Sequence, residues 1–427
     1  MNEPSPPISS NVLSHEAFRA VWIAAVFSYV GTWVQDVGES WLMLSLTRSP
    51  LPVAMLTTAM TVPMFSLLMP AGLMADRLDR RRLLMVSQGV MALAAFGLAV
   101  VTWIGRASPA ALLFASAGLG VGSALSSPAW NSLVPELVPR SETAEAVTLN
   151  SMAFNIARAV GPALGGLILA TRGPGAAFFV NAVSFLGVIE VLRRYDEVKR
   201  VARAVKRQPE PLVRALLAAV VQLRDRKKIR ALHVAVTTFG FAAASVPALL
   251  PVFAKERLQT TGGGYGLLLG AIGCGAVSAA LVLKRVRPLV TARALIAGSM
   301  ATYGVAIVAM STTRSLAVAI VLLFPAGMAW LTTFSTLNAL LQLSTPLHLK
   351  ARALALYQLV FYGAWSLGAF TGGALANRLG SSSVITLAAL GTLAAAALSA
   401  RLPLPSHDGE PLVTRDSLPA PVSTRAP

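Results

Sequence analysis

The sequence predicts an all-α integral membrane protein with about 12 transmembrane helices, arranged as two six-helix pseudo-repeats. Three observations predict this fold class: long apolar runs, a scarcity of charge and an internal repeat. Of the 427 residues, 55% are hydrophobic and 13% are charged. Soluble domains carry about 25% charged residues. The composition therefore argues against a soluble enzyme and against a disordered protein.

The apolar runs are continuous rather than alternating, which predicts helices rather than the strands of a barrel. A helix needs about 20 mainly apolar residues to cross a bilayer, and twelve runs are close to or above that length. The predicted spans are 18–46, 51–75, 83–104, 109–136, 144–171, 175–193, 229–254, 264–284, 291–311, 315–343, 350–377 and 381–401.

A long basic stretch between the sixth and seventh spans divides the chain. Its apolar centre, 211–223, predicts an amphipathic helix on the membrane surface. The expected parts are a cytoplasmic N-terminal tail (1–17), a six-helix bundle (18–193), a basic cytoplasmic linker (194–228), a second six-helix bundle (229–402) and a disordered cytoplasmic tail (403–427).

The net charge of +18 is distributed unevenly along the chain. With both termini inside, 28 of the 36 Lys and Arg residues fall on the inner side and 7 on the outer side. The positive-inside rule then predicts a multi-pass protein of the cell (inner or plasma) membrane with both termini in the cytoplasm. Because the basic residues mark topology and the lipid surface, we expect no nucleic-acid partner.

The internal repeat appears when the chain is shifted by 207 residues. Asn131 then meets Asn338, Pro139 meets Pro346, and the pair Gly165-Gly166 meets Gly372-Gly373. A constant offset across a loop proline and a glycine pair predicts two halves of the same orientation.

The loop after the second span reads GLMADRLDRRR, residues 72–82. It resembles the signature loop of the major facilitator superfamily, with Asp79 in place of a usual glycine. The resemblance, together with the twelve spans and the repeat, covers nearly the whole chain. It implies the major facilitator fold, and it implies a conformational gate formed by Gly72, Asp76, Arg77, Arg80 and Arg81.

The fifth predicted span contains ARAVGPALGG, residues 157–166. This resembles the antiporter motif of exporters in the same superfamily, with Ala157 replacing its first glycine. Small residues let helices approach closely, and a proline can kink a helix. The motif residues are Gly161, Pro162, Gly165 and Gly166. The chain also resembles the branch of the superfamily that includes the enterobactin exporter, on the residues GTWVQDVGESWLML, 31–44. Members of this branch export siderophores, drugs or lipids.

Three ionisable residues lie well inside the predicted spans: Asp36, Glu39 and Arg158. Each costs at least about 2.5–3.5 kcal/mol at the bilayer centre, which predicts a functional role. Asp36 and Glu39 are three residues apart and therefore share one helix face. We expect Asp36 to carry the coupling proton, and a depth difference of about 6 Å would let Arg158 pair with it. The alternative is that both carboxylates are hydrated at the outer mouth.

Polar residues on other spans predict a central cavity. The superfamily resemblance implies that spans one, four, seven and ten line the path, with help from spans two, five, eight and eleven. The candidates are Thr32, Asn131, Asn155, Asn338, Gln342, Tyr357 and Gln358.

These features predict a secondary active transporter, with proton-coupled efflux of an amphipathic small molecule such as a drug or siderophore. Alternatives are a lipid or lysolipid transporter on the same fold and a non-transporting membrane sensor or assembly protein. The expected partners are a small-molecule substrate, protons and the bilayer, for a monomer. No nucleophile arrangement, metal-ligand spacing or phosphate loop is found in the sequence, so we expect no enzyme activity, no metal and no cofactor.

Overall fold

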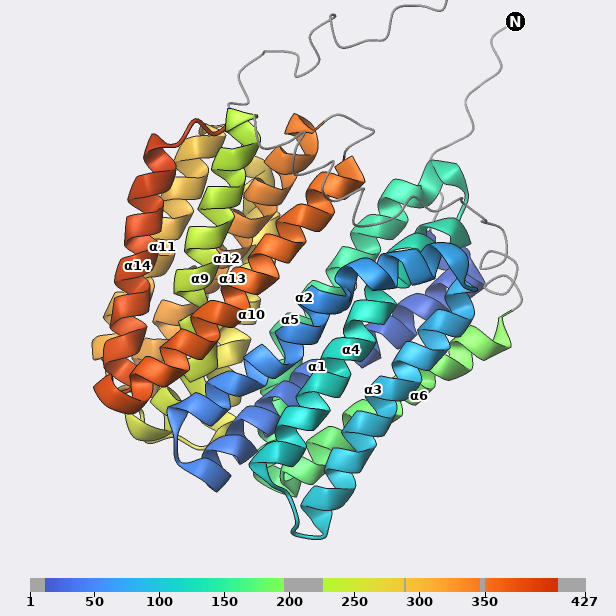
Figure 1. Ribbon diagram of the computed structural model, residues 1–427, viewed down its shortest axis with the longest axis horizontal. Coiled ribbons are helices and arrows are strands. Elements are labelled where there is room, and N and C mark those ends of the chain that lie inside the picture. The colour runs from blue at the N-terminus through green and yellow to red at the C-terminus, as the bar shows by residue number, and fades with distance from the viewer. Residues whose placement is uncertain (1–11, 196–225, 288, 346–349, 406–427) are drawn as a thin grey trace, which may run out of the picture.

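The computed structural model describes residues 12–195, 226–287, 289–345 and 350–405. The predicted amphipathic helix at 211–223 and nearly all of the C-terminal tail lie outside these residues. Within the described ranges the regular structure is helical throughout, and no strand is present (Figure 1).

Twelve long helices account for all twelve predicted spans. They are α1 (Glu16–Thr47), α2 (Pro50–Arg77), α3 (Arg80–Trp103), α4 (Pro109–Leu133), α5 (Thr143–Arg172), α6 (Pro174–Arg194), α9 (Lys227–Glu256), α10 (Gly262–Val286), α11 (Ala292–Thr312), α12 (Leu316–Ser344), α13 (Lys350–Leu379) and α14 (Ser381–Arg401). Eleven of them are long and apolar enough to cross a membrane, and the described residues of α2 contain a shorter apolar stretch, Pro50–Met64. The predicted fourth span is too long, because a 3₁₀ turn, Val134–Leu137, follows α4.

Local signals set the helix ends. Side chains of Ser108, Thr291 and Ser315 accept hydrogen bonds from the backbone of the first turns of α4, α11 and α12. Gly173 and Gly380 follow α5 and α13, with φ of +78° and +82°. A left-handed φ favours glycine, and these two glycines are separated by the same 207-residue offset as the repeat.

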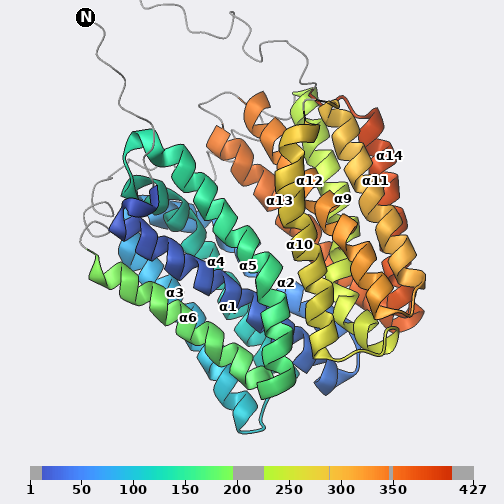
Figure 2. The ribbon, with the colours of Figure 1, turned by 180° about the vertical axis from the view of Figure 1, so that it is seen from behind.

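The helices form two bundles, α1–α6 (the N half) and α9–α14 (the C half), which lie side by side in Figures 1 and 2. The first and last described residues lie at one end of the molecule, here called the terminal end. The halves meet along two seams, α2 against α13 and α5 against α10.

The glycines of the repeat make equivalent contacts in the two halves. A Cβ on Gly165 would meet Val34 of α1, and one on Gly372 would meet Ser245 of α9. The next glycines face the other half: Gly166 contacts α10, and Gly373 contacts α2. Each repeated glycine pair therefore lets its helix pack closely against a helix of its own half and against a helix of the opposite half.

The seams are closed at the end opposite to the termini. Ser49 Oγ donates to Asn377 Oδ1 at 3.0 Å, and Thr58 Oγ1 donates to the Ser366 carbonyl at 3.4 Å. Ser49 directly precedes α2, and Thr58 lies in the half of α2 nearest this opposite end. Towards the terminal end the two bundles diverge (Figure 1).

Candidate functional site between the halves

Asp36 lies near the middle of α1 with an exposed side chain, although the residues on either side of it are buried. Helix α1 packs against α5 and α6 of its own half. The accessible side of Asp36 therefore faces the C half, where Tyr265 of α10 interacts with it electrostatically. In the described part of the chain, Asp36 forms no ion pair within 4.0 Å and no hydrogen bond.

Glu39 has different surroundings, because it is 5% exposed inside the N half. Its Oε1 accepts a hydrogen bond from Gln35 Nε2 at 2.6 Å, and its Oε2 accepts one from Ser116 Oγ of α4 at 2.6 Å. Asn181 Nδ2 of α6 donates to Gln35 Oε1 at 2.7 Å. Gln35, Ser116 and Asn181 are almost fully buried as well. This Glu39 network joins three helices of one half.

The polar residues along α1 therefore differ in exposure. Thr32 and Asp36 are accessible, whereas Ser28 and Glu39 are buried. The idea that Glu39 is hydrated at an outer mouth is wrong, and Glu39 does not share a cavity face with Asp36. Asp36 and Glu39 are only about 60° apart around the α1 axis, yet the neighbouring helices bury Glu39 and leave Asp36 accessible.

Arg158 lies near the middle of α5 and reaches across to the C half. Its guanidinium carbon is 5.7 Å from the ring centroid of Trp330 on α12, a cation–π contact, and Tyr303 of α11 interacts with it electrostatically. The structure does not bring Arg158 within ion-pair distance of Asp36.

Trp330 belongs to a cluster of aromatic side chains that the sequence analysis missed. Its ring centroid lies 4.4 Å from that of Phe334 and 4.9 Å from that of Trp365 on α13, and Phe361 lies 4.7 Å from Phe334. All four side chains are partly exposed, and we call them the aromatic wall. The i, i+4 spacing of 330 with 334 and of 361 with 365 was a usable signal, since it places each pair on one helix face.

A second aromatic contact closes the opposite end of the site. Trp41 of α1 stacks on Tyr265 of α10, with ring centroids 6.3 Å apart, and Lys255 Nζ of α9 lies 5.9 Å from the Trp41 ring centroid. Ser40 contacts the hydroxyl group of Tyr265. Tyr265 thus contacts Trp41 and Ser40 and also lies near Asp36.

Residues 9–426 match the major facilitator family described as transmembrane secretion effectors. The chain belongs to this family. It is therefore a transporter and not an enzyme, and it is a multi-pass membrane protein.

Curated relatives of this secretion-effector chain are exporters and transporters. It is 27% identical to the multidrug efflux pump Tap of Mycolicibacterium fortuitum, over 84% of this chain and 89% of the relative. It is 26% identical to the enterobactin exporter EntS of Salmonella typhimurium, over 89% of this chain and 88% of that protein. The staphyloferrin A transporter of Staphylococcus aureus is 26% identical, over 60% of this chain and 64% of that protein.

Solved structures support the same fold at low sequence identity. A crystal structure of the peptide transporter POT has a TM-score of 0.76 at 13% identity, covering 90% of this chain and 93% of that one. The D-xylose–proton symporter has a TM-score of 0.72 at 14% identity, covering 94% of this chain and 100% of that one.

The signature loop of this transporter lies at the terminal end. Asp79 has φ −60° and caps α3, where its Oδ1 accepts from the Arg82 backbone N–H at 3.1 Å. A glycine is not required at that φ, which accounts for the departure from the family pattern.

The arginines of the signature loop bind within the N half. Arg80 pairs with Glu136 at 3.0 Å, and Arg81 Nε donates to the Leu192 carbonyl at 2.6 Å. Both bonds stay within the N half. The side chains of Gly72, Asp76 and Arg77 are outside the described part.

The predicted cavity residues divide into accessible and buried groups. Thr32 and Asn155 donate to the backbone carbonyls of their own helices, and Asn131 is exposed. Gln342 Nε2 donates to Asn338 Oδ1 at 2.5 Å on α12, and both side chains are partly exposed.

Tyr357 and Gln358 are neighbours on α13 with different exposure. Tyr357 is 4% exposed and packs against His233 of α9, with ring centroids 6.3 Å apart, whereas Gln358 is partly exposed. Tyr357 thus packs inside the C half rather than facing the N half. Across the residues that the structure describes, no group of three His, Cys, Asp or Glu side chains could hold a metal ion.

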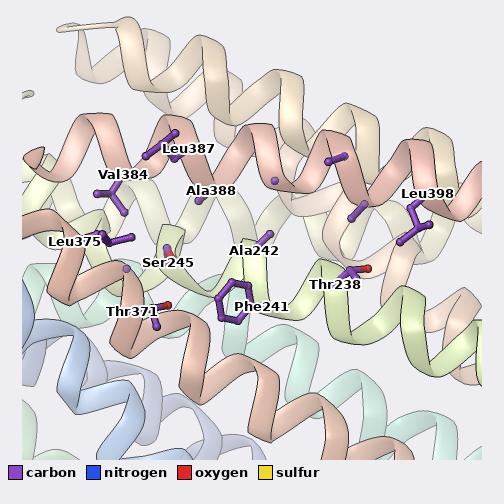
Figure 3. Close-up of a pocket in the computed structure, with 14 residues that line it drawn as sticks. Thr238, Phe241, Ala242, Ser245, Thr371, Leu375, Val384, Leu387, Ala388 and Leu398 are labelled. Carbon is purple, nitrogen blue, oxygen red and sulfur yellow. The ribbon is translucent and has the colours of Figure 1, made fainter.

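A separate apolar groove of about 450 Å³ lies between α9, α13 and α14 (Figure 3). Phe241, Leu375, Leu387 and Leu398 line it and are exposed. None of the predicted site residues lines this groove. Exposed apolar side chains of this kind are what a lipid-facing surface of a transporter requires.

Proposed function

We propose that this transporter exports an amphipathic small molecule in exchange for protons, by alternating access at the site between the halves. The observation that carries the proposal is Asp36, an unpaired carboxyl group in mid-membrane that faces the opposite half. The named activities of the relatives, multidrug efflux and enterobactin export, support the direction.

Proton binding at Asp36 would supply the coupling. A charged carboxylate is costly in mid-membrane, and a bound proton removes that charge. Since Asp36 faces Tyr265 of the C half, its charge acts on the seam that must open and close. We assign Asp36 the role of proton carrier and Arg158 that of a fixed positive charge on the path, while Glu39 holds the N half together.

The terminal end is proposed to be cytoplasmic. Of the basic residues that the structure describes, most lie at this end, including Arg80, Arg81 and Arg82 of the signature loop, as the positive-inside rule requires. With that orientation, the closed seams lie on the outer side and the site opens inwards. Gly72, Asp76, Arg77, Arg80 and Arg81 would form the gate that closes in the opposite state. The antiporter-like glycines would let the seam between α5 and α10 re-form in each cycle.

Reconstituted proteoliposomes test this function. An imposed pH gradient should drive flux of an amphipathic probe, and a protonophore should abolish it. The probes are 2-naphthoate, ethidium and lysophosphatidylcholine, with proton movement recorded by a trapped pH dye. Gradient-driven flux of lysophosphatidylcholine alone would support the lipid-transporter alternative. Absence of flux for all three probes, or flux that a protonophore leaves unchanged, would contradict the proposal.

A further inference from the structure

The aromatic wall offers flat apolar surfaces at mid-depth between the halves. Trp330 lies at the middle of α12 and Trp365 near the middle of α13. The rings meet at tilted and edge-to-face angles of 41–72°, an arrangement that leaves ring faces for a further ring to stack on. All four side chains remain partly exposed although they pack on the core of the C half.

Arg158 faces this wall from the opposite half. A guanidinium has five N–H donors, and in the described residues none of those of Arg158 donates a hydrogen bond or enters an ion pair. Its recorded contacts are the Trp330 ring and the electrostatic interaction with Tyr303. A cation in mid-membrane with free donors favours an anionic partner, because charge-assisted hydrogen bonds to carboxylate are the strong ones.

Asp36 and Arg158 are not paired with each other. Asp36 faces Tyr265 of α10, whereas the backbone of Arg158 contacts Gly273 of the same helix. These two positions on α10 are eight residues apart, about 12 Å along its axis, which describes the level of the Arg158 backbone and not that of its guanidinium. A ligand anion held at Arg158 therefore leaves Asp36 free to bind and release a proton.

We infer that the aromatic wall and Arg158 together bind a substrate whose flat aromatic ring carries an anionic group. The inference rests on the proposed transport function and specifies its substrate class. The ring stacks on the wall, and the carboxylate or phenolate oxygen accepts hydrogen bonds from the Arg158 guanidinium. An aromatic cation is disfavoured there, because Arg158 already lies over the Trp330 face and would repel it.

Equilibrium binding to the full-length transporter in lipid nanodiscs, without a pH gradient, tests this class. The probes share one ring system: 2-naphthoate, 2-naphthamide and 2-naphthylmethylammonium. We expect naphthoate to bind at least about tenfold more tightly than the amide, the difference typical of hydrogen bonds to a charged group, and the ammonium compound to bind most weakly. Equal binding of the three, or preference for the ammonium compound, would overturn the inference.

Variants locate the effect. Arg158→Gln should remove the preference for naphthoate, and Arg158→Lys should keep a reduced one. Trp330→Leu should weaken all three probes by about three- to tenfold while preserving their order, since it removes stacking but not charge. Arg106→Gln, which changes an exposed arginine between α3 and α4, is the matched control and should change nothing.

Two results separate this inference from the proposed function. If Arg158→Gln retains the naphthoate preference, the inference fails even when gradient-driven flux of other probes persists. If naphthoate binds as expected but no probe is transported, the binding class stands and the transport proposal fails.

Discussion

Asp36 and Glu39 lie less than one turn apart on α1, yet their surroundings differ completely. Glu39 accepts two hydrogen bonds of 2.6 Å inside the N half, and Asp36 faces the C half without such bonds. A carboxylate with satisfied hydrogen bonds favours a stable structure, whereas an unpaired and accessible one is free to exchange a proton. This difference in surroundings is the basis for proposing a structural role for Glu39 and a coupling role for Asp36.

Asp36→Asn should abolish flux driven by a pH gradient, because the amide keeps the shape but cannot exchange a proton. The protein should still be present in the membrane at normal levels. Flux in proteoliposomes and the amount of protein in the membrane are the two measurements. Undiminished gradient-driven flux by this variant would remove Asp36 from the mechanism.

Glu39→Leu should destabilise the N half, because Gln35 Nε2 and Ser116 Oγ lose their buried acceptor. Each unsatisfied group costs roughly 1–3 kcal/mol. Glu39→Gln should cost less, since the amide oxygen can still accept. Apparent Tm in detergent measures both, with the exposed Glu190→Gln on α6 as control. A Tm for Glu39→Leu equal to that of the control would show that the network does not stabilise the fold.

At the scale of helices, the glycine contacts determine how closely the halves approach. A Cβ on Gly266 of α10 would lie 2.6 Å from the Pro162 carbonyl oxygen and 2.8 Å from Gly166 Cα. Real Cβ atoms do not approach backbone so closely, so the seam between α5 and α10 depends on the absence of side chains. Pro162, in the same motif, has no backbone N–H, so α5 lacks one helix hydrogen bond next to this contact.

Gly266→Leu should hold α5 and α10 apart and so make the end of the molecule opposite to the termini more accessible to solvent. A cysteine introduced at Ser40, in a background with Cys274 replaced by serine, should react at least several-fold faster with an impermeant thiol reagent. Gly97→Leu on α3 is the matched control, because nothing lies within 4 Å of its Cβ position. Equal reaction rates in the two variants would contradict the role of this seam.

At the scale of the whole molecule, the two halves repeat one design around the site. Gly165 and Gly372 pack on α1 and α9, while Gly166 and Gly373 pack across the seams. Two similar halves joined along two seams are suited to the proposed alternating access, in which one half rocks against the other without unfolding either bundle. In the proposed orientation, the basic residues at the terminal end place that end in the cytoplasm.

The orientation can be measured by labelling intact cells. We expect a cysteine at Arg106 to react with an impermeant reagent added outside, and one at Arg82 to react only after permeabilisation. The physical reason is the excess of basic residues at the terminal end, which favours retention in the cytoplasm. Labelling of Arg82→Cys in intact cells would reverse the assignment and with it the inward-open description.

Much of the fold was predictable because its signals are local. A run of apolar residues long enough to cross a bilayer must form a helix there, whatever its neighbours are, and the boundaries of α1 and α14 follow from such runs. The 207-residue repeat and the signature loop likewise needed no coordinates. The site was only partly predictable: Asp36 and Arg158 were identified by their charge, but the direction of each side chain was not.

The sequence by itself determined an all-α membrane transporter with two similar halves and three ionisable residues in its spans. Only the tertiary structure decided that Glu39 binds Gln35 and Ser116 inside one half, and that Arg158 lies over Trp330 rather than beside Asp36. The physical reason is that the rotation of a helix against its neighbours depends on packing between residues far apart in the sequence, such as Glu39 and Ser116, which are 77 positions apart. A pattern along one helix identifies a polar residue, but the helices packed around it determine whether it is buried or faces the substrate path.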